Sequence, residues 1–598
     1  MIDGAGGRTE GSRSDRRLFM GLLAIVALAS SLTPIRNYDY WWHLKTGHWI
    51  LSHGAVPRAD PYSFTAAGAL WVDHEWLAQV ILFMGHSVLG PAGLVALKAA
   101  LVLGLCALMA CHVRREGHGP GMVAILPAVA LMGASFRLDV RPELSTVLLL
   151  PLVVHLVLRA RDSGRPGPLL LVPVLVAIGS NLHVGAILVP ALLLPGAALT
   201  WIDERRGLFR GAAAPPSPAR PLASRLALTA LAAAVAAGAN PFGYRIYAVP
   251  FEIRRLLESL PSPNLEWMRP DLSGFPLFWI SAAAAALLVL VAPRRIDPIA
   301  TPALLIGALL AAAHLRNIGL FFALLPHGLA RPARAAARTF ADRFTVATGV
   351  AAPRARPGFV AAAVLLFSAP ALLPVLPPPI AWGVGLAPGN EPRAAVDFVE
   401  RERIGRRLYN DVRFGGYLIW RRFPDARVFI DGRNEIYPGL LREVFGSLND
   451  SRAWEGFLAR LEVDAAFLRY APALEQVVRP GAYGRRGRVS ARAFSANHFP
   501  KEAWALVYWD DDAMIMLRRT PENAGVIARQ EYRAIQPEDW RHDYAGVLSG
   551  RVPLGPILAE LQRKTGEDPD CARARALLAT FAGLHRRRDA PGRAPAGR

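Results

Sequence analysis

Charged residues are scarce in this chain of 598 residues: Asp, Glu, Lys and Arg make up 19% of it, whereas 53% is hydrophobic. Soluble globular proteins carry about 25% charged residues, and the mean hydropathy here is positive, at +0.27. This shortage argues against a soluble protein of ordinary composition. Long apolar runs stand in place of the missing charge, such as 91–110 and 144–160. They match the roughly 20 residues that a helix needs to cross a bilayer.

Cysteine is scarce as well. Cys106, Cys111 and Cys571 are too few for a disulfide framework, and the first two lie within one apolar run. A convincing small-residue cleavage site is also missing after the first apolar run. We therefore expect this run to be retained as a membrane anchor rather than removed as a signal peptide.

Basic residues exceed acidic ones, with 68 Lys and Arg against 47 Asp and Glu and a net charge of +21. In a soluble protein this excess would suggest a nucleic acid partner. Here the arginines lie between apolar runs, where they report membrane topology. We expect membrane lipids, and no nucleic acid, as partners.

Eleven apolar segments are predicted to cross the membrane. They lie at about 18–34, 91–112, 121–135, 144–160, 168–180, 183–201, 224–239, 275–292, 298–313, 316–330 and 357–376. The segments between the spans fall alternately on the two sides of the membrane. Those on the side of the N-terminus carry 22 Lys and Arg, and those on the other side carry ten. This bias predicts a cytoplasmic N-terminus and a C-terminal domain outside.

The predicted fold is a polytopic α-helical membrane protein of about eleven spans followed by a small α/β extracytoplasmic domain. The expected parts are a cytoplasmic tail (1–17), a transmembrane domain (18–380) with a first outer loop (35–90), the α/β domain (385–520), and helical segments with a basic tail (521–598). In the α/β domain, 407–437 predicts a strand, a glycine turn, a short helix and a strand at ARVFIDG. The run LEVDAAFLRY predicts another strand, and AWALVYWDDDAMIMLRR predicts a hairpin that turns at Asp510–Asp512.

Polar clusters interrupt the apolar pattern at the span ends that this topology places outside. They lie at 38–43, 72–76, 136–143, 180–183, 240–245 and 314–317. One such cluster alone would be a helix cap. Six on one side predict a shared polar site at the outer face, because polar groups near membrane depth tend to line a site or cavity.

The segment after the first anchor reads NYDYWWHLKTGHWI. Asp39 and His43 are four residues apart, so they share a face if the segment is helical. Trp41, Trp42 and Trp49 suit a membrane interface. The segment predicts an interfacial helix that displays an acid and an imidazole at headgroup depth. The plain alternative is an aromatic belt in which Asp39 caps the helix.

This segment resembles the first outer loop of the C-type superfamily of membrane glycosyltransferases. DYWWHLK is similar to the Asp-Pro-Trp-Trp-His-Tyr-Arg type of run in oligosaccharyltransferase catalytic subunits, although Tyr40 replaces the proline. The stretch from Asp39 through GHWILSHGAVPR to Glu75 is similar to the first loop of aminoarabinose transferases and protein O-mannosyltransferases. The resemblance implies a GT-C-like enzyme of the bacterial cytoplasmic (inner) membrane. Such an enzyme transfers a sugar from a polyprenyl-phosphate donor to a glycan, lipid or protein acceptor at the outer face.

The resemblance implies that Asp39 is the catalytic base and Glu75 a second acidic residue. We expect His43 to take part in catalysis by orienting the site rather than by the proton transfer. The donor phosphate needs cationic or hydrogen-bonding groups at headgroup depth. The predicted phosphate-binding residues end different spans on the outer side: Arg137, Arg141, His183 and Arg316. The alternative for each arginine is snorkelling, or pairing with Asp139 or Glu143.

Acceptor recognition is predicted in the α/β domain, where NDVRFGGY and IDGR provide Asp411, Asp431 and Arg433. The alternative is that these residues mark strand ends and turns. The tryptophan-rich motif by which oligosaccharyltransferases recognise an acceptor peptide is missing from the corresponding run, so recognition of an Asn sequon is not implied.

A divalent cation such as Mg or Mn is a candidate cofactor. Asp39 together with Asp60, Asp73 or Glu75 offers carboxylate oxygens. Carboxylates in loops are common without a metal, so the requirement stays open.

Two other functions are compatible with the composition, namely a transporter or flippase of a lipid-linked saccharide and a non-catalytic scaffold of envelope polysaccharide assembly. The sequence lacks the internal repeat and the paired broken helices that are typical of transporters. The enzyme hypothesis requires Asp39 to lie near the outer arginines.

Overall fold

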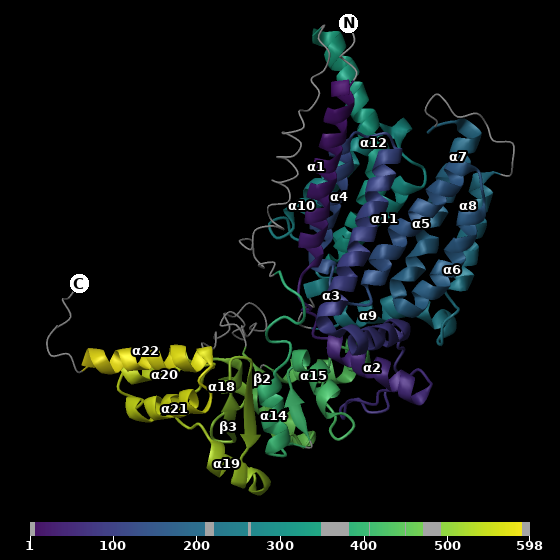
Figure 1. Cartoon of the computed structure of the whole chain (residues 1–598). Helices are drawn as coiled ribbons and strands as arrows, with labels where there is room; N and C mark the ends of the chain where they lie inside the picture. Colours follow the sequence, from purple (N-terminus) through teal and green to yellow (C-terminus); the bar gives the residue numbers. More distant parts are fainter. Residues whose placement is uncertain are drawn as a thin grey trace, which may run out of the picture. The chain divides into compact units, whose positions relative to one another are not determined.

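The computed structural model describes residues 6–209, 221–260, 265–348, 382–405, 407–448, 450–470 and 492–588. They form two compact units (Figure 1). The larger, helical unit comprises residues 1–58 and 72–387, and the smaller, mixed unit comprises 59–71 and 388–598. The segment 59–71, which the sequence places in the first outer loop, therefore belongs to the unit that contains the sheet.

The helical unit is a bundle of helices, most of them apolar (Figure 1). They are α1 (Gly6–Ser31), α2 (Tyr40–His53), α3 (Trp76–Arg115), α4 (Pro120–Ala134), α5 (Leu144–Ser163), α6 (Gly167–Leu182), α7 (Leu188–Arg206), α8 (Leu222–Ala236), α9 (Val249–Glu258), α10 (Pro276–Val291), α11 (Ala300–Ala313) and α12 (Ile318–Thr348). α7 packs on α8, α11 on α12 and α1 on α4. The side chains buried between the helices are mainly aliphatic and aromatic.

Ten of the eleven predicted spans coincide with helices of this bundle, and the last, 357–376, lies outside the described residues. By length and composition, Trp76–Arg115, Pro120–Arg137, Leu144–Ser163 and Val184–Arg206 could each cross a membrane. α6, α8, α10 and α11 are shorter apolar helices. The chain thus has the character of a helical membrane protein, while the number of crossings and their orientation stay predictions.

About half of the predicted first outer loop, 35–90, is helical in the structure. α2 lies within it, and α3 begins before its end and continues past Gly90. Gly90 has φ 66° and ψ −177°, and Pro91 follows it, so the helix breaks there and continues in a new direction. The backbone around Asp39 and Glu75 is therefore held by helices at both positions.

The smaller unit contains a four-stranded mixed sheet in the order β1-β2-β4-β3. The strands are β1 (Leu408–Asn410), β2 (Ala465–Arg469), β3 (Trp504–Trp509) and β4 (Ala513–Arg518). β1 pairs with β2 in parallel, and β4 pairs antiparallel with β2 and β3. The helices are α14 (Arg393–Arg401), α15 (Val412–Arg422), α16 (Pro438–Ser447), α17 (Ser451–Arg460), α18 (Phe494–His498), α19 (Ala524–Gln530), α20 (Trp540–Leu548), α21 (Leu554–Glu567) and α22 (Ala572–Arg588).

The predicted hairpin is confirmed as β3 and β4. Asp510 closes its turn, because the carboxylate accepts the backbone N–H groups of Asp512 and Ala513, both at 2.8 Å. The strand predicted in LEVDAAFLRY is confirmed as β2. After α22, residues 589–598 of the basic tail lie outside the described residues.

The predicted glycine turn is wrong, since Gly415 and Gly416 lie inside α15. A Cβ atom on Gly415 would lie 2.2 Å from the carbonyl oxygen of Ile430. Glycine is required there for close packing of the helix on the following segment rather than for a turn.

The strand predicted at 426–432 is also wrong. Among the described residues, Val428 makes an isolated bridge to Ser63 and the run joins no strand of the sheet. The Asn410 side chain takes over part of the pairing: its amide donates to the Ile430 carbonyl at 2.7 Å, and its oxygen accepts from the Phe429 N–H at 2.9 Å. These side-chain contacts satisfy backbone groups that a neighbouring strand would otherwise pair.

Candidate active site

Asp39 immediately precedes α2, as expected for a residue displayed by that helix. It stands at the N-cap position, yet its carboxylate makes no cap hydrogen bond. Its Oδ1 instead accepts from the Trp42 indole N–H at 3.0 Å, and its backbone N–H donates to the Asn37 side chain at 3.1 Å. Asp39 thus occupies the N-cap position without a side-chain cap hydrogen bond, and its catalytic role stays a prediction.

α2 is helical as predicted, but two of its three tryptophans are buried in the protein rather than displayed to lipid. Trp41 and Trp42 are only 4% and 6% exposed. A Cβ atom on Gly47 would lie 2.2 Å from the carbonyl oxygen of Gln79, so glycine allows α2 to lie directly on the first part of α3. This close packing holds α2, and with it Asp39, in place.

Two arginines that follow α4 converge on one carboxylate. Arg137 Nη1 and Arg141 Nη1 both donate to Glu266 Oε1, each at 2.9 Å. Arg137 Nη2 also pairs with Glu143, as the alternative for that residue anticipated. Arg141 Nη2 lies 3.6 Å from Asp39 Oδ2. The structure thus brings Asp39 together with the outer arginines, as the enzyme hypothesis requires.

Glu266 is a site residue that the sequence analysis missed. It belongs to a 3₁₀ turn, Leu265–Trp267, in the connection before α10. Burial alone would raise its pKa, but Arg141, Arg137 and Arg316 hold the pKa of this carboxyl well below its usual range. The predicted clamp residue Arg316 also lies here, with its guanidinium 4.9 Å from the centroid of the Trp267 ring. A single glutamate in a loop has no spacing signal, so only the fold reveals its position.

Glu75, which precedes α3, is the centre of a second cluster. The Nε2 atoms of His43, His74 and His183 each lie 3.8 Å from one of its carboxylate oxygens. Burial raises the pKa of Glu75 to about 8, against the opposing effect of Arg141. Glu75 is therefore a carboxyl group that holds a proton at neutral pH, as suits a proton donor or relay.

His183 is a neutral imidazole rather than a cation. Its Nδ1 accepts from the Gly185 N–H at 3.1 Å and lies 2.8 Å from the Thr146 hydroxyl. The ring proton therefore sits on Nε2, which faces Glu75. His183 Nε2 lies 3.8 Å from Glu75 Oε1, and contact with a donor phosphate stays a prediction for this residue.

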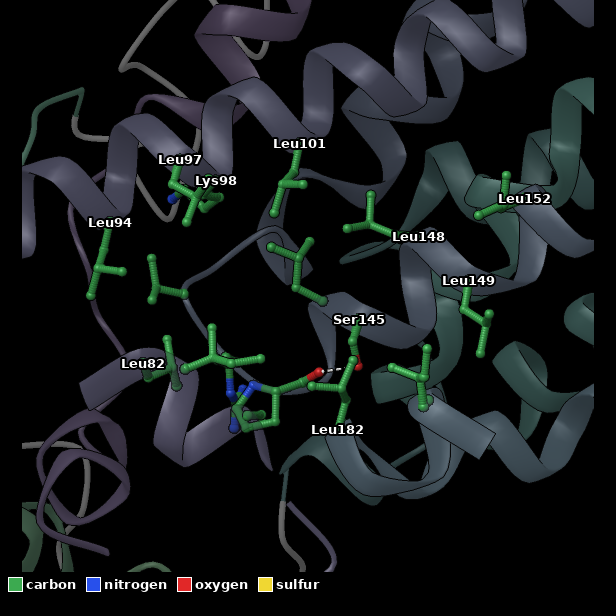
Figure 2. A pocket seen from close by; sticks show the side chains of 18 of the residues that line it. Leu82, Leu94, Leu97, Lys98, Leu101, Ser145, Leu148, Leu149, Leu152 and Leu182 are labelled. Atoms are coloured by element: carbon green, nitrogen blue, oxygen red, sulfur yellow. Dashed lines mark hydrogen bonds between the residues drawn. The ribbon is translucent and has the colours of Figure 1, made fainter. Parts of the chain in front are cut away.

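An apolar cavity of about 350 Å³ adjoins Arg141. Side chains of α3, α5 and α6 form its wall, and Figure 2 shows Leu97, Lys98 and Leu101 of α3 among them. Arg141 lines the same cavity. The Lys98 ammonium donates to the Thr33 carbonyl at 2.9 Å. An apolar chamber with a guanidinium at its wall suits an amphiphile with an anionic head.

The residues predicted to bind the acceptor, Asp411, Asp431 and Arg433, all lie in the smaller unit. The Asp431 and Arg433 side chains are 0% exposed and form an ion pair, and Arg433 Nη2 also lies 2.9 Å from Asp60 Oδ1. The Tyr437 hydroxyl donates to Asp431 at 2.6 Å. Because these charges are buried and already paired, the geometry corrects the expected acceptor role of Asp431 and Arg433 to a structural one.

Both carboxylate oxygens of Asp411 accept hydrogen bonds from within the smaller unit. Oδ1 caps α15 by accepting the Arg413 N–H at 2.9 Å, and Oδ2 accepts from Arg469 Nε at 3.0 Å. Its side chain nevertheless keeps 24% exposure, so contact with an acceptor stays a prediction for this residue.

The carboxylates considered for Mg or Mn do not form an oxygen cage among the described residues. Asp60 belongs to the smaller unit and is engaged by Arg433. Asp73 Oδ1 accepts from the Gln79 amide at 2.6 Å. Imidazole nitrogens surround Glu75, and Asp39 faces a guanidinium. Mg and Mn prefer oxygen ligands, so these residues do not fit such a cation.

Comparison with known proteins finds no matching protein family and no matching curated protein. Similar solved structures include the oligosaccharyltransferase AglB from Archaeoglobus fulgidus in complex with an inhibitory peptide and a dolichol-phosphate (10% identity, TM-score 0.47, 76% of this chain and 69% of that one). They also include ArnT from Cupriavidus metallidurans bound to undecaprenyl phosphate (12%, 0.42, 86% and 98%). The arabinosyltransferase EmbB from Mycobacterium smegmatis is similar too (17%, 0.36, 78% and 45%). At these identities the likeness concerns the course of the chain and assigns no residue.

Proposed function

We propose that this chain is a membrane glycosyltransferase that moves a sugar from a polyprenyl-phosphate-linked donor to an acceptor at the outer face of the membrane. The position of Arg141 carries the proposal: this residue lines the apolar cavity and also lies 3.6 Å from the Asp39 carboxylate. A single side chain thus joins a chamber suited to a lipid tail with a group suited to accept a proton.

The donor phosphate binds to Arg137 and Arg141 in this proposal. Their guanidiniums already converge on one anionic oxygen, Glu266 Oε1, at 2.9 Å from each. A phosphate oxygen carries the same charge and accepts the same charge-assisted hydrogen bonds, so it takes the place of the glutamate. The prenyl chain then lies in the cavity beside Arg141.

Asp39 is the proposed general base. It takes the proton of an acceptor hydroxyl or amine as that oxygen or nitrogen attacks the anomeric carbon of the sugar. The bond between this carbon and the donor phosphate breaks, and the electron pair leaves with the phosphate. Arg137 and Arg141 stabilise the charge that develops on the leaving group. Attack opposite the leaving group inverts the anomeric configuration.

The Glu75 cluster supports the base from the side of α3. Glu75 holds its proton near neutral pH, and His43 and His183 fix the orientation of its carboxyl group. A protonated carboxyl group close to the arginines leaves their positive charge available to the phosphate.

The proposed setting is the bacterial cytoplasmic membrane, with the smaller unit on its outer side. The distribution of basic residues supports this orientation, with 22 against ten in alternate connections. The acceptor is a glycan, lipid or protein of the cell envelope.

Incubation of membranes containing the protein with a panel of radiolabelled polyprenyl-phosphate sugars tests the proposal. We expect one donor to pass its label to an envelope lipid, glycan or protein fraction, and the Asp39→Asn variant to leave the label on the donor. A flippase would move the labelled lipid between leaflets of proteoliposomes without any transfer. A scaffold would do neither, and either result would refute the enzyme proposal.

A further inference from the structure

Three histidines from separate helices meet inside the helical unit. They are His112 of α3, His155 of α5 and His327 of α12. One ring nitrogen from each lies within 4.8 Å of the other two. His112 and His327 are buried and His155 is half-buried. The three helices pack against one another in pairs, so the cluster lies at the point where they join.

The ring nitrogens of this cluster are largely unsatisfied within the described part of the chain. His112 Nε2, His155 Nδ1 and both nitrogens of His327 are buried without a hydrogen-bond partner there. Leaving a buried polar atom unpaired costs about 1–3 kcal/mol. The nearby His118 shows the usual solution, because its Nε2 lies 2.7 Å from the Ala330 carbonyl. The cluster therefore presents several nitrogen lone pairs or N–H groups that no described residue binds.

We propose that His112, His155 and His327 form a binding site for a divalent transition-metal ion of the zinc type. Neutral imidazole is a favoured ligand of zinc, copper and nickel, and three histidines with one open position make a common zinc site. A bound ion would give the unpaired ring nitrogens a partner and so remove the cost of leaving them unpaired.

The geometry requires a small contraction. Zinc–nitrogen bonds of about 2.0–2.1 Å place tetrahedral ligands about 3.3–3.4 Å apart, compared with the 4.8 Å limit within which the three nitrogens lie now. The His112 and His327 rings are stacked at 4.6 Å, and the His155 ring stands at 88° to that of His327. Rotation of the side chains brings the nitrogens together, and the helices can stay in place.

The charges around the cluster are mixed. Asp297 acts electrostatically on both His112 and His327 and partly balances a bound cation. Its carboxylate is itself held by Arg161 and by the backbone N–H of Ala300 at 3.0 Å. Arg161 opposes a cation at His112, and Arg115 and Arg159 oppose one at His155. Since the carboxylate is already engaged, water or a small anion fills the fourth position.

The metal site is separate from the candidate active site. At 1.5 Å per residue, His155 lies about 17 Å along α5 from Leu144, and His327 lies about 14 Å along α12 from Ile318. Arg141 and Arg316 precede the starts of these two helices. The ion therefore ties three helices together away from the sugar chemistry, and the inference does not depend on the proposed enzyme function.

Cobalt binding by the full-length protein tests the site. The protein is purified in detergent with a tag that contains no histidine, stripped with a chelator and titrated with Co²⁺. We expect about one cobalt per chain with the visible absorption of tetrahedral coordination, displaced by Zn²⁺. Loss of one of three protein ligands in His327→Asn should weaken cobalt binding at least about hundredfold.

His118→Asn is the matched control, because it removes a nearby histidine that already has a hydrogen-bond partner, and it should bind cobalt like the parent protein. His155→Asn, at the half-buried position, serves as a second ligand variant should His327→Asn misfold. The absence of cobalt from the parent protein, or equal binding by the parent and both ligand variants, would overturn the proposal.

Discussion

The Arg141 guanidinium and the Asp39 carboxylate lie 3.6 Å apart, although one follows α4 and the other precedes α2. Each has a further partner, Glu266 for the arginine and Trp42 for the aspartate. In the proposed reaction, the pair links phosphate binding by Arg141 to proton acceptance by Asp39. When a phosphate engages Arg141, the carboxylate loses part of its counter-charge, and we expect it to become a stronger proton acceptor.

The first prediction concerns Asp39→Asn. The amide keeps the size of the side chain and an oxygen that accepts from the Trp42 indole, but it cannot take a proton from an acceptor. General base catalysis contributes about 10²–10⁴ in rate, so transfer of labelled sugar should fall at least about a hundredfold at unchanged donor binding. Asp271→Asn, at an exposed aspartate of the same unit, is the control. A transfer rate near the parent value would show that Asp39 is not the base.

A second prediction separates Glu266 from the arginines that it engages. Glu266→Gln removes the anion that competes with phosphate, whereas Arg141→Gln removes a phosphate ligand. Charge-assisted contacts are worth about 1.5–3 kcal/mol, so affinity for undecaprenyl phosphate should rise about tenfold in the first variant and fall about tenfold in the second. Titration monitored by tryptophan fluorescence measures both.

The matched control for this pair is Glu258→Gln, at an exposed glutamate of α9 that bonds to Arg254. Its affinity for the lipid should equal that of the parent protein. Weaker binding in Glu266→Gln would mean that Glu266 orients the arginines rather than competing with the donor.

Much of the helical unit could be predicted, because an apolar run of membrane-spanning length is recognised from consecutive residues alone. The clustering of polar residues at span ends also led to Asp39, Glu75 and Arg141. The partners of these residues could not be predicted. Glu266 is a lone acid in a loop, and the charge state of His183 depends on the Gly185 N–H that meets its Nδ1.

The wrong predictions in the smaller unit have the same physical origin, because contacts with residues elsewhere in the chain decide the local structure. Gly415 looks like a turn residue, but it is a helical residue that faces the Ile430 carbonyl. The run 426–432 has the composition of a strand, yet Asn410 satisfies part of its backbone. The histidines of the proposed metal site likewise lie one to a helix, with no local spacing that would mark them as ligands.

A third prediction addresses orientation across the membrane. Leu208 and Ala459 are exposed and lie on opposite sides in the predicted topology. In a background without the three native cysteines, a membrane-impermeant maleimide should label Ala459→Cys in intact spheroplasts. It should label Leu208→Cys only after the membrane is opened. Labelling of Leu208→Cys from outside would reverse the scheme.

A fourth prediction tests the structural role assigned to Asp431. Asp431→Asn leaves the buried Arg433 guanidinium with one carboxylate fewer, and breaking a buried ion pair destabilises a protein by about 3–5 kcal/mol. The smaller unit should unfold at lower denaturant concentration and become sensitive to protease, while Asp425→Asn should not change it. A stable variant that has lost only acceptor affinity would restore the acceptor role predicted from the sequence.

The last prediction follows from the pKa of Glu75, which burial raises to about 8 from the ordinary value of 4.5. The folded protein keeps a proton on Glu75 over a pH range in which the unfolded chain has released it. Stability from this group is therefore fully present below about pH 4.5 and is lost as the pH rises through about 8. The thermal midpoint of the parent protein in detergent should fall over this range.

Glu75→Gln keeps the size of the side chain but cannot ionise, so this part of the pH dependence should disappear. The variant should be more stable than the parent above about pH 8 and closer to it at about pH 5. Glu252→Gln, at an exposed position of α9, should keep the slope of the parent. Parallel curves for the parent and Glu75→Gln would mean that the carboxyl group titrates normally. The three imidazoles around it would then face a carboxylate, and His43 or His183 rather than Glu75 would carry the proton.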